Sequence, residues 1–352
     1  MKSRKQTIGW LYVFLVFLIN SGYADIPLRG FSDATYEYSD NPEISGKHSF
    51  AVGQFDFFLN SALGKKAKFL AEAVFEFDST NTTEVKLERL LVKYDIHRLF
   101  EVTAGRVHTA LGFYNQQYHH GSWLETAIDR PLTYSFENDS ILPIHLTGLE
   151  ISGLDSIGQL GHFGFIIGVG NGRGTSPKNI LTVNDSNNFK ALNGLIFFRP
   201  SFLYGLQLGF GGYWDKIEKA KNLTEDLREV IAGVHLIYDA HHLQFMAEGF
   251  RIHHHGKTSG EDLQTYGYYA QLGYEIEQWT PYIKYDQIDF PKKDDRFWAN
   301  THFHQQDLYR LTGGLRFDIT DFNALKFEYR LEDRKGGDSL INALKVQTAW
   351  TF

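Results

Sequence analysis

The feature that most constrains this chain is a series of segments of about ten residues in which apolar and polar side chains alternate. Residues 68–78, 325–332 and 345–352 all show this period of two, and the last of them, KVQTAWTF, ends on Phe352. Such a period is that of a β-strand with one apolar and one polar face. Strands of soluble sandwiches have about 5 to 6 residues, whereas a tilted strand needs about 9 to 11 to cross a membrane. Because only a closed barrel leaves no unpaired edge in lipid, the pattern predicts an all-β, closed antiparallel transmembrane β-barrel.

Segments of this kind recur along the whole sequence, and their count predicts about 16 strands, an even number as single-chain bacterial barrels require. The even-numbered connections between them are short, such as IHR and TDF, and the odd-numbered ones are mostly longer. Short turns at one end and long loops at the other are typical of membrane barrels, so the short turns are expected in the periplasm. The predicted strands begin near residues 28, 49, 67, 85, 99, 145, 161, 189, 203, 228, 241, 264, 280, 308, 323 and 340.

The N-terminal segment predicts export. Three basic residues precede an apolar run at residues 8–19, and the small residues Gly22 and Ala24 precede Asp25. The run is shorter than the roughly 20 residues of a spanning helix, so residues 1–24 are interpreted as a cleaved secretory signal peptide. The barrel domain then covers residues 25–352.

The cysteine content and the net charge of the sequence exclude some modifications and one class of partner. The sequence holds no cysteine, so it offers neither a disulfide framework nor a cysteine for lipid attachment. Without the three basic residues of the signal, 35 minus 3 leaves 32 Lys and Arg against 42 Asp and Glu, a formal charge of −10. This acidic balance argues against nucleic acid as a partner.

The third outer connection, residues 105–145, is by far the longest, and ordered domains seldom carry a loop of that length without using it. It resembles the third outer loop of the Gram-negative porin superfamily, which folds back into the barrel and narrows the pore. Its opening, GRVHTALG, resembles a Gly-Lys-x-x-x-Pro-x-Gly stretch of the phosphate-selective porin O and P family. Gly105 and Gly112 match that stretch, while Arg106 replaces the lysine and Ala110 the proline. Phosphate selectivity is not carried over, because the loop is not strongly basic.

The resemblance implies further properties. The terminal Phe352 resembles the signal by which barrel proteins reach the barrel assembly machinery of the outer membrane, and the superfamily implies a homotrimer surrounded by outer-membrane lipid and lipopolysaccharide. If the long loop enters the lumen, its charged side chains form the constriction, and basic side chains at inward positions form the facing wall. The expected constriction residues are Arg106, Glu125, Asp129, Arg130, Glu137 and Asp139, and the expected wall residues are Lys68, Arg89, Lys93, Arg310, Arg316, Lys326 and Arg330, together with Lys284 and Lys345.

Two arrangements of these charges stay open. An acidic loop against a basic wall would set a field across a narrow aperture. Alternatively, acids interleaved on the wall, at positions 286, 318, 328 and 332, would neutralise it locally.

Other chemical patterns are weaker. GVGNGRG at residues 168–174 has glycines at dinucleotide-like spacing, but no amphipathic helix follows it. Adjacent histidines, such as those at 253–255, point to opposite faces of a strand and cannot share one metal ion. Nothing in the spacing singles out a nucleophile for a Ser-His-acid enzyme. We therefore expect no catalytic residues, no metal and no cofactor.

About 16 strands favour a water-filled pore, because 8-strand barrels are filled by side chains. The sequence predicts a passive outer-membrane channel for small hydrophilic solutes or ions, active in ion transport and without enzymatic activity. An outer-membrane enzyme and an adhesin or structural barrel without an open pore stay as alternatives.

Overall fold

A computed structural model describes most of the barrel domain. The described residues are 28–42, 47–77, 81–118, 121–135, 140–177, 183–184, 187–219, 223–293, 295–298, 305–336 and 340–352. The predicted signal peptide at residues 1–24 lies outside them, as do the two expected constriction residues Glu137 and Asp139.

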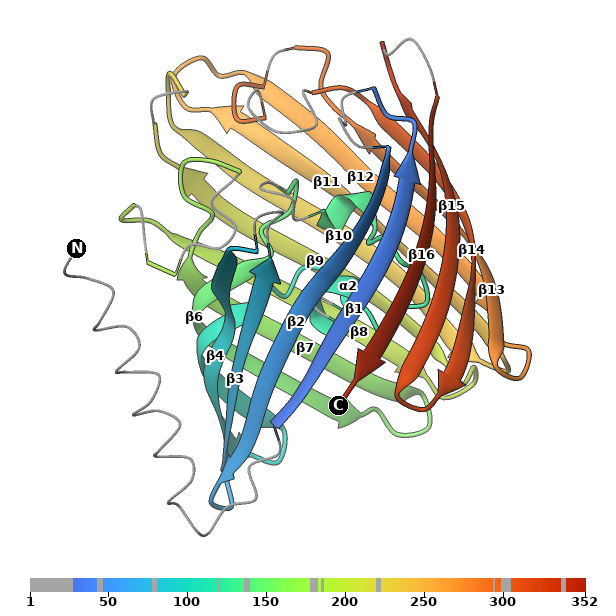
Figure 1. Ribbon diagram of the computed structural model, residues 1–352. Helices are drawn as coiled ribbons and strands as arrows, with labels where there is room; N and C mark the ends of the chain where they lie inside the picture. Colours follow the sequence, from blue (N-terminus) through green and yellow to red (C-terminus); the bar gives the residue numbers. More distant parts are fainter. Residues whose placement is uncertain are drawn as a thin grey trace, which may run out of the picture.

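Sixteen strands form one closed antiparallel barrel in which each strand pairs with its neighbours in the chain and β16 pairs with β1 (Figure 1). The strands are β1 (Leu28–Ser39), β2 (His48–Leu63), β3 (Ala67–Phe77), β4 (Thr83–His97), β5 (Phe100–His108), β6 (His145–Ser156), β7 (Gly161–Asn171), β8 (Lys190–Pro200), β9 (Leu206–Ile217), β10 (Leu227–Ala240), β11 (Leu243–Gly256), β12 (Asp262–Tyr274), β13 (Trp279–Asp289), β14 (Leu308–Thr320), β15 (Asn323–Arg334) and β16 (Ile341–Thr351). The predicted fold class is confirmed, and every strand begins within three residues of its predicted position.

The two faces of the wall follow the alternation of the sequence. On β16, Leu344 and Phe352 are exposed on the outer face, whereas Lys345 and Gln347 turn inward, toward Asp129 and Asp33 respectively. The same division holds on β15, where Phe327 is exposed and its neighbours Lys326 and Glu328 are buried inside. The outer face is therefore apolar, and the inner face carries the charges.

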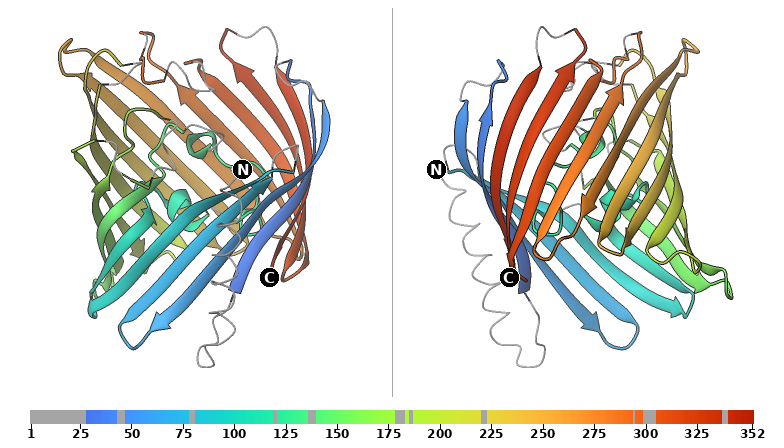
Figure 2. Two further views of the ribbon diagram at one scale, coloured as in Figure 1. Left: turned by 60° about the vertical axis from the view of Figure 1, so that its left-hand side comes forward. Right: turned by 90° about the vertical axis from the view of Figure 1, so that its right-hand side faces the viewer.

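The long connection between β5 and β6 lies within the ring of strands (Figure 2). Its described residues contain one short helix, α2 (Phe113–Gln117), and one 3-10 turn, η1 (Leu132–Tyr134). Among the described residues, no helix is long and apolar enough to cross a membrane.

One side of this connection packs against the inner wall through apolar contacts. Leu111, Tyr134 and Ile141 belong to one buried cluster with inward side chains of β9 to β12, among them Phe250. Gly211 on β9 makes room for the connection, because a Cβ atom at that position would lie 2.2 Å from the carbonyl oxygen of Leu111. The connection is thus seated on one half of the wall and faces the other half with its charged residues.

Candidate functional site inside the barrel

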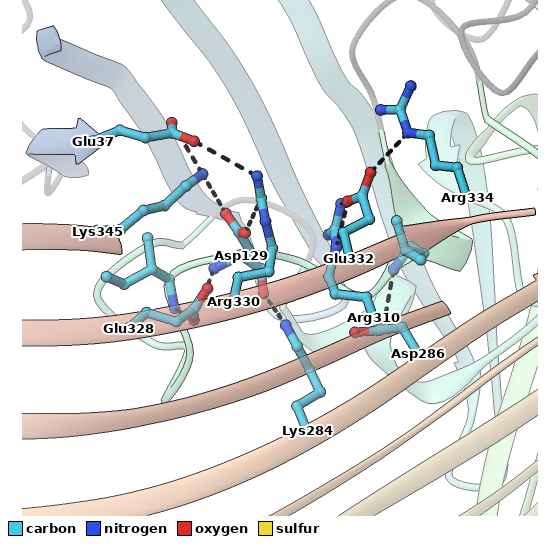
Figure 3. A network of polar contacts seen from close by, with 12 residues as sticks. Glu37, Asp129, Lys284, Asp286, Arg310, Glu328, Arg330, Glu332, Arg334 and Lys345 are labelled. Carbon is cyan, nitrogen blue, oxygen red and sulfur yellow. Dashed lines mark hydrogen bonds and ion pairs between the residues drawn. The ribbon is translucent and has the colours of Figure 1, made fainter. Parts of the chain in front are cut away.

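Asp129 fixes the tip of the long connection to the opposite half of the wall (Figure 3). Its carboxylate oxygens accept hydrogen bonds from Arg330 Nη1 on β15 at 2.5 Å and from Lys345 Nζ on β16 at 2.6 Å. Both cations also lie near Glu37 on β1, at 3.6 Å and 3.3 Å. The three wall strands that meet here are the ones that close the barrel.

The backbone around Asp129 is held as well. The amide N–H of Ile128 donates to the Glu328 carboxylate at 2.9 Å, and that of Asp129 donates to the same oxygen at 3.3 Å. The carbonyl oxygen of Asp129 accepts a hydrogen bond from Lys284, and that of Ala127 accepts one from Lys326 at 3.1 Å. Wall side chains therefore bind this segment through both its peptide groups and its carboxylate.

These contacts fix the ionisation of Asp129. Burial opposes its negative charge, but Lys345 and Arg330 outweigh this and hold the pKa of Asp129 well below its usual range. Glu125 behaves in the opposite way, because burial raises the pKa of its carboxyl in spite of the nearby Arg130 and Lys326. Only one of these two predicted loop acids is thus held firmly as an anion.

Glu125 faces away from solvent. Its side chain is buried, and its carbonyl oxygen accepts from Arg316 Nη1 at 2.9 Å. The same Arg316 donates to the carbonyl oxygen of Trp123 at 2.6 Å and forms an ion pair with Asp318 on its own strand at 2.7 Å. Arg316 and Lys326 thus bind backbone carbonyls of the long connection, whereas the sequence led us to expect wall cations that face its acidic side chains.

The remaining predicted constriction residues are spread out. Arg130 reaches the other side of the ring and donates to Gln54 on β2 at 3.4 Å. Arg106 is buried at the top of β5, where its Nε donates to the carbonyl oxygen of Glu88 at 3.0 Å. The structure places Asp129 and Arg130 at one tip and Arg106 in a separate cluster.

The predicted wall residues also divide into groups. Arg330 meets the long connection, whereas Arg310 is bound by Glu332 of the neighbouring strand at 2.7 Å. The cations of β3 and β4 are paired within that part of the wall: Lys68 with Asp95 and Glu101, Arg89 with Glu72, and Lys93 with Glu101. Both arrangements foreseen from the sequence therefore occur, the loop-to-wall pairing at Asp129 and local neutralisation elsewhere.

The labelled groups of Figure 3 are balanced in number but not in accessibility. Five are acidic, Glu37, Asp129, Asp286, Glu328 and Glu332, and five are basic, Lys284, Arg310, Arg330, Arg334 and Lys345. Four of the cations have side chains between 13% and 22% exposed, Arg310, Arg330, Lys345 and Arg334. Among the acids only Glu37, at 33%, and Asp129, at 12%, are comparably exposed, since Glu332 is at 4% and Glu328 and Asp286 are buried. By number, the more exposed groups of this network are therefore four cations and two acids, and the most exposed single group is Glu37.

The sequence analysis missed the acid that holds α2. Glu248 on β11 accepts hydrogen bonds from the amides of Phe113 and Tyr114, both at 2.8 Å, and from the hydroxyls of Tyr134 and Tyr269 at 3.1 Å and 2.7 Å. A carboxylate beside the first amides of a helix satisfies donors that have no partner within the helix. An acid at an inward position between Met246 and Phe250 was the signal that could have found it.

A second missed cluster lies at the end of the barrel that carries the long connections. Glu229 on β10 accepts from Arg173 Nη1 at 2.9 Å and contacts His254 Nε2 at 3.0 Å. His254 Nδ1 contacts Asp295 at 2.7 Å, and Arg173 Nη2 donates to the carbonyl oxygen of Ser140 at 2.5 Å. All these side chains are buried, so the cluster ties three outer connections together.

The three consecutive histidines of β11 lie on alternate faces of the strand, as strand geometry requires. His254 points inward, whereas His253 and His255 lie on the outer face and share Asp262, at 2.7 Å and 2.9 Å. Within the described ranges, no three His, Asp or Glu side chains are placed to hold a metal ion together.

The comparisons with known proteins concern the fold. No protein-family model and no curated protein matches this sequence. An anion-selective porin from Comamonas acidovorans superposes with a TM-score of 0.64 at 12% identity, over 93% of this chain and 99% of that chain. The outer membrane channel DcaP of Acinetobacter baumannii gives 0.62 at 11%, and OmpF of Salmonella typhi in complex with daunomycin gives 0.62 at 12%, each over 93% of this chain and 97% of the other. The chain therefore shares the closed 16-strand barrel fold of outer-membrane porins.

Proposed function

We propose that this protein is a passive outer-membrane channel for small hydrophilic solutes or ions, narrowed by residues 106–144. The observation that carries the proposal is the set of contacts at Asp129. A segment seated on one half of the wall is bound by Arg330 and Lys345 of the other half, so it crosses the interior instead of lining it. Barrels of 16 to 18 strands enclose an aqueous lumen, and a segment across that lumen limits its width.

The proposed constriction favours anions. The exposed charges of the network around it are four cations against two acids, and the Asp129 carboxylate is already engaged by two of those cations. A cationic surface in a narrow aperture raises the local concentration of anions. Of the four acids counted in the long connection, Asp129 is paired and Glu125 is buried, and the other two lie outside the described residues.

The remaining parts of the proposal rest on the sequence patterns described above and on the fold that the chain shares with porins. They are a cleaved signal at residues 1–24, delivery by the assembly machinery through Phe352, and a homotrimer in a membrane containing lipopolysaccharide. The short resemblance to the phosphate-selective porin O and P family does not identify the solute. An enzyme or an adhesin without an open pore is the competing proposal, and no residue cluster described above favours a particular reaction.

The test is a planar-bilayer recording of the purified, folded protein. We expect stepwise, voltage-independent increases in current at each insertion and a reversal potential of anion-preferring sign in a salt gradient. The heat-unfolded preparation is the control and should give no steps. A folded preparation that inserts without conducting would support the enzyme or adhesin alternative.

A further inference from the structure

The outer face of the barrel carries two exposed arginines near the long-connection end of β10 and β11. Arg228 and Arg251 are exposed, and each is followed in the sequence by a buried, inward-facing residue, Glu229 after Arg228 and Ile252 after Arg251. In the part of the chain that the structure describes, neither guanidinium has a hydrogen bond or an ion pair. An unpaired cation on the apolar side of a barrel wall is costly unless a headgroup or water receives it.

A lysine and two histidines lie near these arginines on the outer face. The strand register sets Arg228 opposite Lys216 on β9 and opposite His255 on β11, and it sets His253 between the rows of the two arginines. The rows of Arg228 and Arg251 lie four residue pairs apart, which corresponds to about 13 Å along the wall at a rise of about 3.3 Å per residue. The cluster is therefore wide enough for more than one phosphate.

Two acidic residues share this surface, and each has partners other than the two arginines. Asp262 contacts His253 and His255, and Asp289 accepts from the side chain of Gln287 at 2.7 Å. Lys216 is partly neutralised by Asp226 at 3.2 Å. The two arginines are thus the available cations of this surface.

Directly beside Arg251 the outer wall is hollowed. A depression of about 500 Å³ is lined by Ala232 and Gly249 and is flanked by the larger side chains of Phe210, Val234 and Tyr268. The small residues make the hollow, because a Cβ atom on Gly249 would have nothing closer than 3.7 Å. The depression is apolar except for Arg251 and Asp289 at its rim, which is the shape and chemistry that an acyl chain beneath a charged headgroup requires.

Aromatic side chains mark the level of this surface. Trp214 is paired with Val230 beside Arg228, and Tyr266 is paired with Arg251. Trp and Tyr collect where a membrane barrel meets the lipid headgroups. The arginines therefore lie at headgroup height and the hollow reaches toward the acyl chains.

We propose that Arg228 and Arg251 bind the phosphates of a phosphorylated glycolipid of the outer leaflet, the lipid A part of lipopolysaccharide, with one acyl chain in the hollow over Ala232 and Gly249. The proposal rests on the outer-membrane placement proposed above, with the long connections outside. Arginine suits this role because its planar fork makes paired, charge-assisted hydrogen bonds to phosphate.

The test measures binding of fluorescent lipopolysaccharide to the folded protein in detergent. Arg228→Gln combined with Arg251→Gln should weaken binding by about tenfold or more, as expected when charge-assisted hydrogen bonds to phosphate are removed. Gly249→Leu should weaken it independently by filling the hollow. Lys65→Gln with Lys66→Gln removes two positive charges from an exposed turn at the other end of the barrel and should leave binding unchanged.

Each variant is first checked for folding by heat-modifiable gel mobility and for conductance in a bilayer. Parental lipopolysaccharide affinity in the double arginine variant would overturn the site. Phosphatidylglycerol that competes as well as lipopolysaccharide would overturn the assignment to a glycolipid, because it would indicate a general anionic-lipid surface. Since none of these substitutions touches the lumen, normal conductance with lost lipid binding separates this site from the proposed channel. Lipid binding without conductance would refute the proposed channel function and leave the lipid site standing.

Discussion

Replacing Asp129 with asparagine should loosen the tip of the long connection and widen the pore, although Glu328 and Lys284 keep their hydrogen bonds to its backbone. The substitution keeps the size of the side chain but removes the charge that Arg330 and Lys345 share. Removing one member of a buried ion pair costs about 3 to 5 kcal/mol. Here Glu37 stays within 3.6 Å and 3.3 Å of the same cations, so we expect the smaller loss of about 2 to 3 kcal/mol that a charge-assisted contact is worth.

Such a loss shifts the ratio of docked to undocked tip by about 30- to 140-fold, since each 1.4 kcal/mol is a factor of ten. The expected result is a larger and noisier single-channel current. The freed cations should also move the reversal potential further toward anions, more at 0.1 M salt, where screening acts over about 10 Å, than at 1 M, where it acts over about 3 Å.

The matched control is Glu332→Gln. It also replaces a carboxylate of the network with an amide, but Glu332 pairs with Arg310 within the wall and does not contact the long connection. Its conductance should stay near the parental value. If Asp129→Asn folds and conducts like the parent protein, the tip does not limit the pore and the proposed constriction is wrong.

Three further substitutions test other parts of the structure. Gly211→Leu should displace the long connection and raise the single-channel conductance, because even a Cβ atom would collide with the Leu111 carbonyl oxygen. Gly212→Leu, on the open outer face, should leave the conductance unchanged. Phe327→Arg should destabilise the folded barrel by about 2 to 4 kcal/mol, while Phe327→Leu should cost far less, as measured by urea titration of folding into liposomes. Phe352→Asp should lower the amount of folded protein in outer membranes, since the Phe352 ring stacks on Phe55 at 5.6 Å, and Phe322→Asp in an exposed turn should leave that amount unchanged; equal levels would remove the role assigned to the last strand.

The strands could be predicted from the sequence because lipid and an aqueous interior impose opposite demands on alternate residues. Any shift of one position would turn the charges of β15, such as Lys326 and Glu328, toward the apolar side. The pattern therefore fixes the face of each residue even where its partner is unknown. This is why all the predicted strand positions agree with the structure to within three residues.

The pairing of charges inside the barrel could not be predicted in the same way. Asp129 and Arg330 are 201 positions apart, and their contact depends on ring closure and on where the long connection rests. The sequence indicated that Glu72 and Glu328 face the lumen, but not that they are buried there by Arg89 and by Ile128 and Tyr282. Counting the charges of the long connection likewise could not show that Glu125 is buried.

Ring closure also has a kinetic consequence. Every strand pair except one joins neighbours in the chain, while the β1–β16 pair joins residues as far apart as Gly30 and Thr351, 321 positions away. Relative to a connection of about 10 residues, closing a flexible loop of that length costs about 3 kcal/mol more in chain entropy. The consecutive hairpins are therefore favoured to form first, each at low contact order, and the seam between β1 and β16 forms last. Until it does, the molecule is an open sheet with two free hydrogen-bonding edges, which is the form most exposed to aggregation and the one that a chaperone must shield.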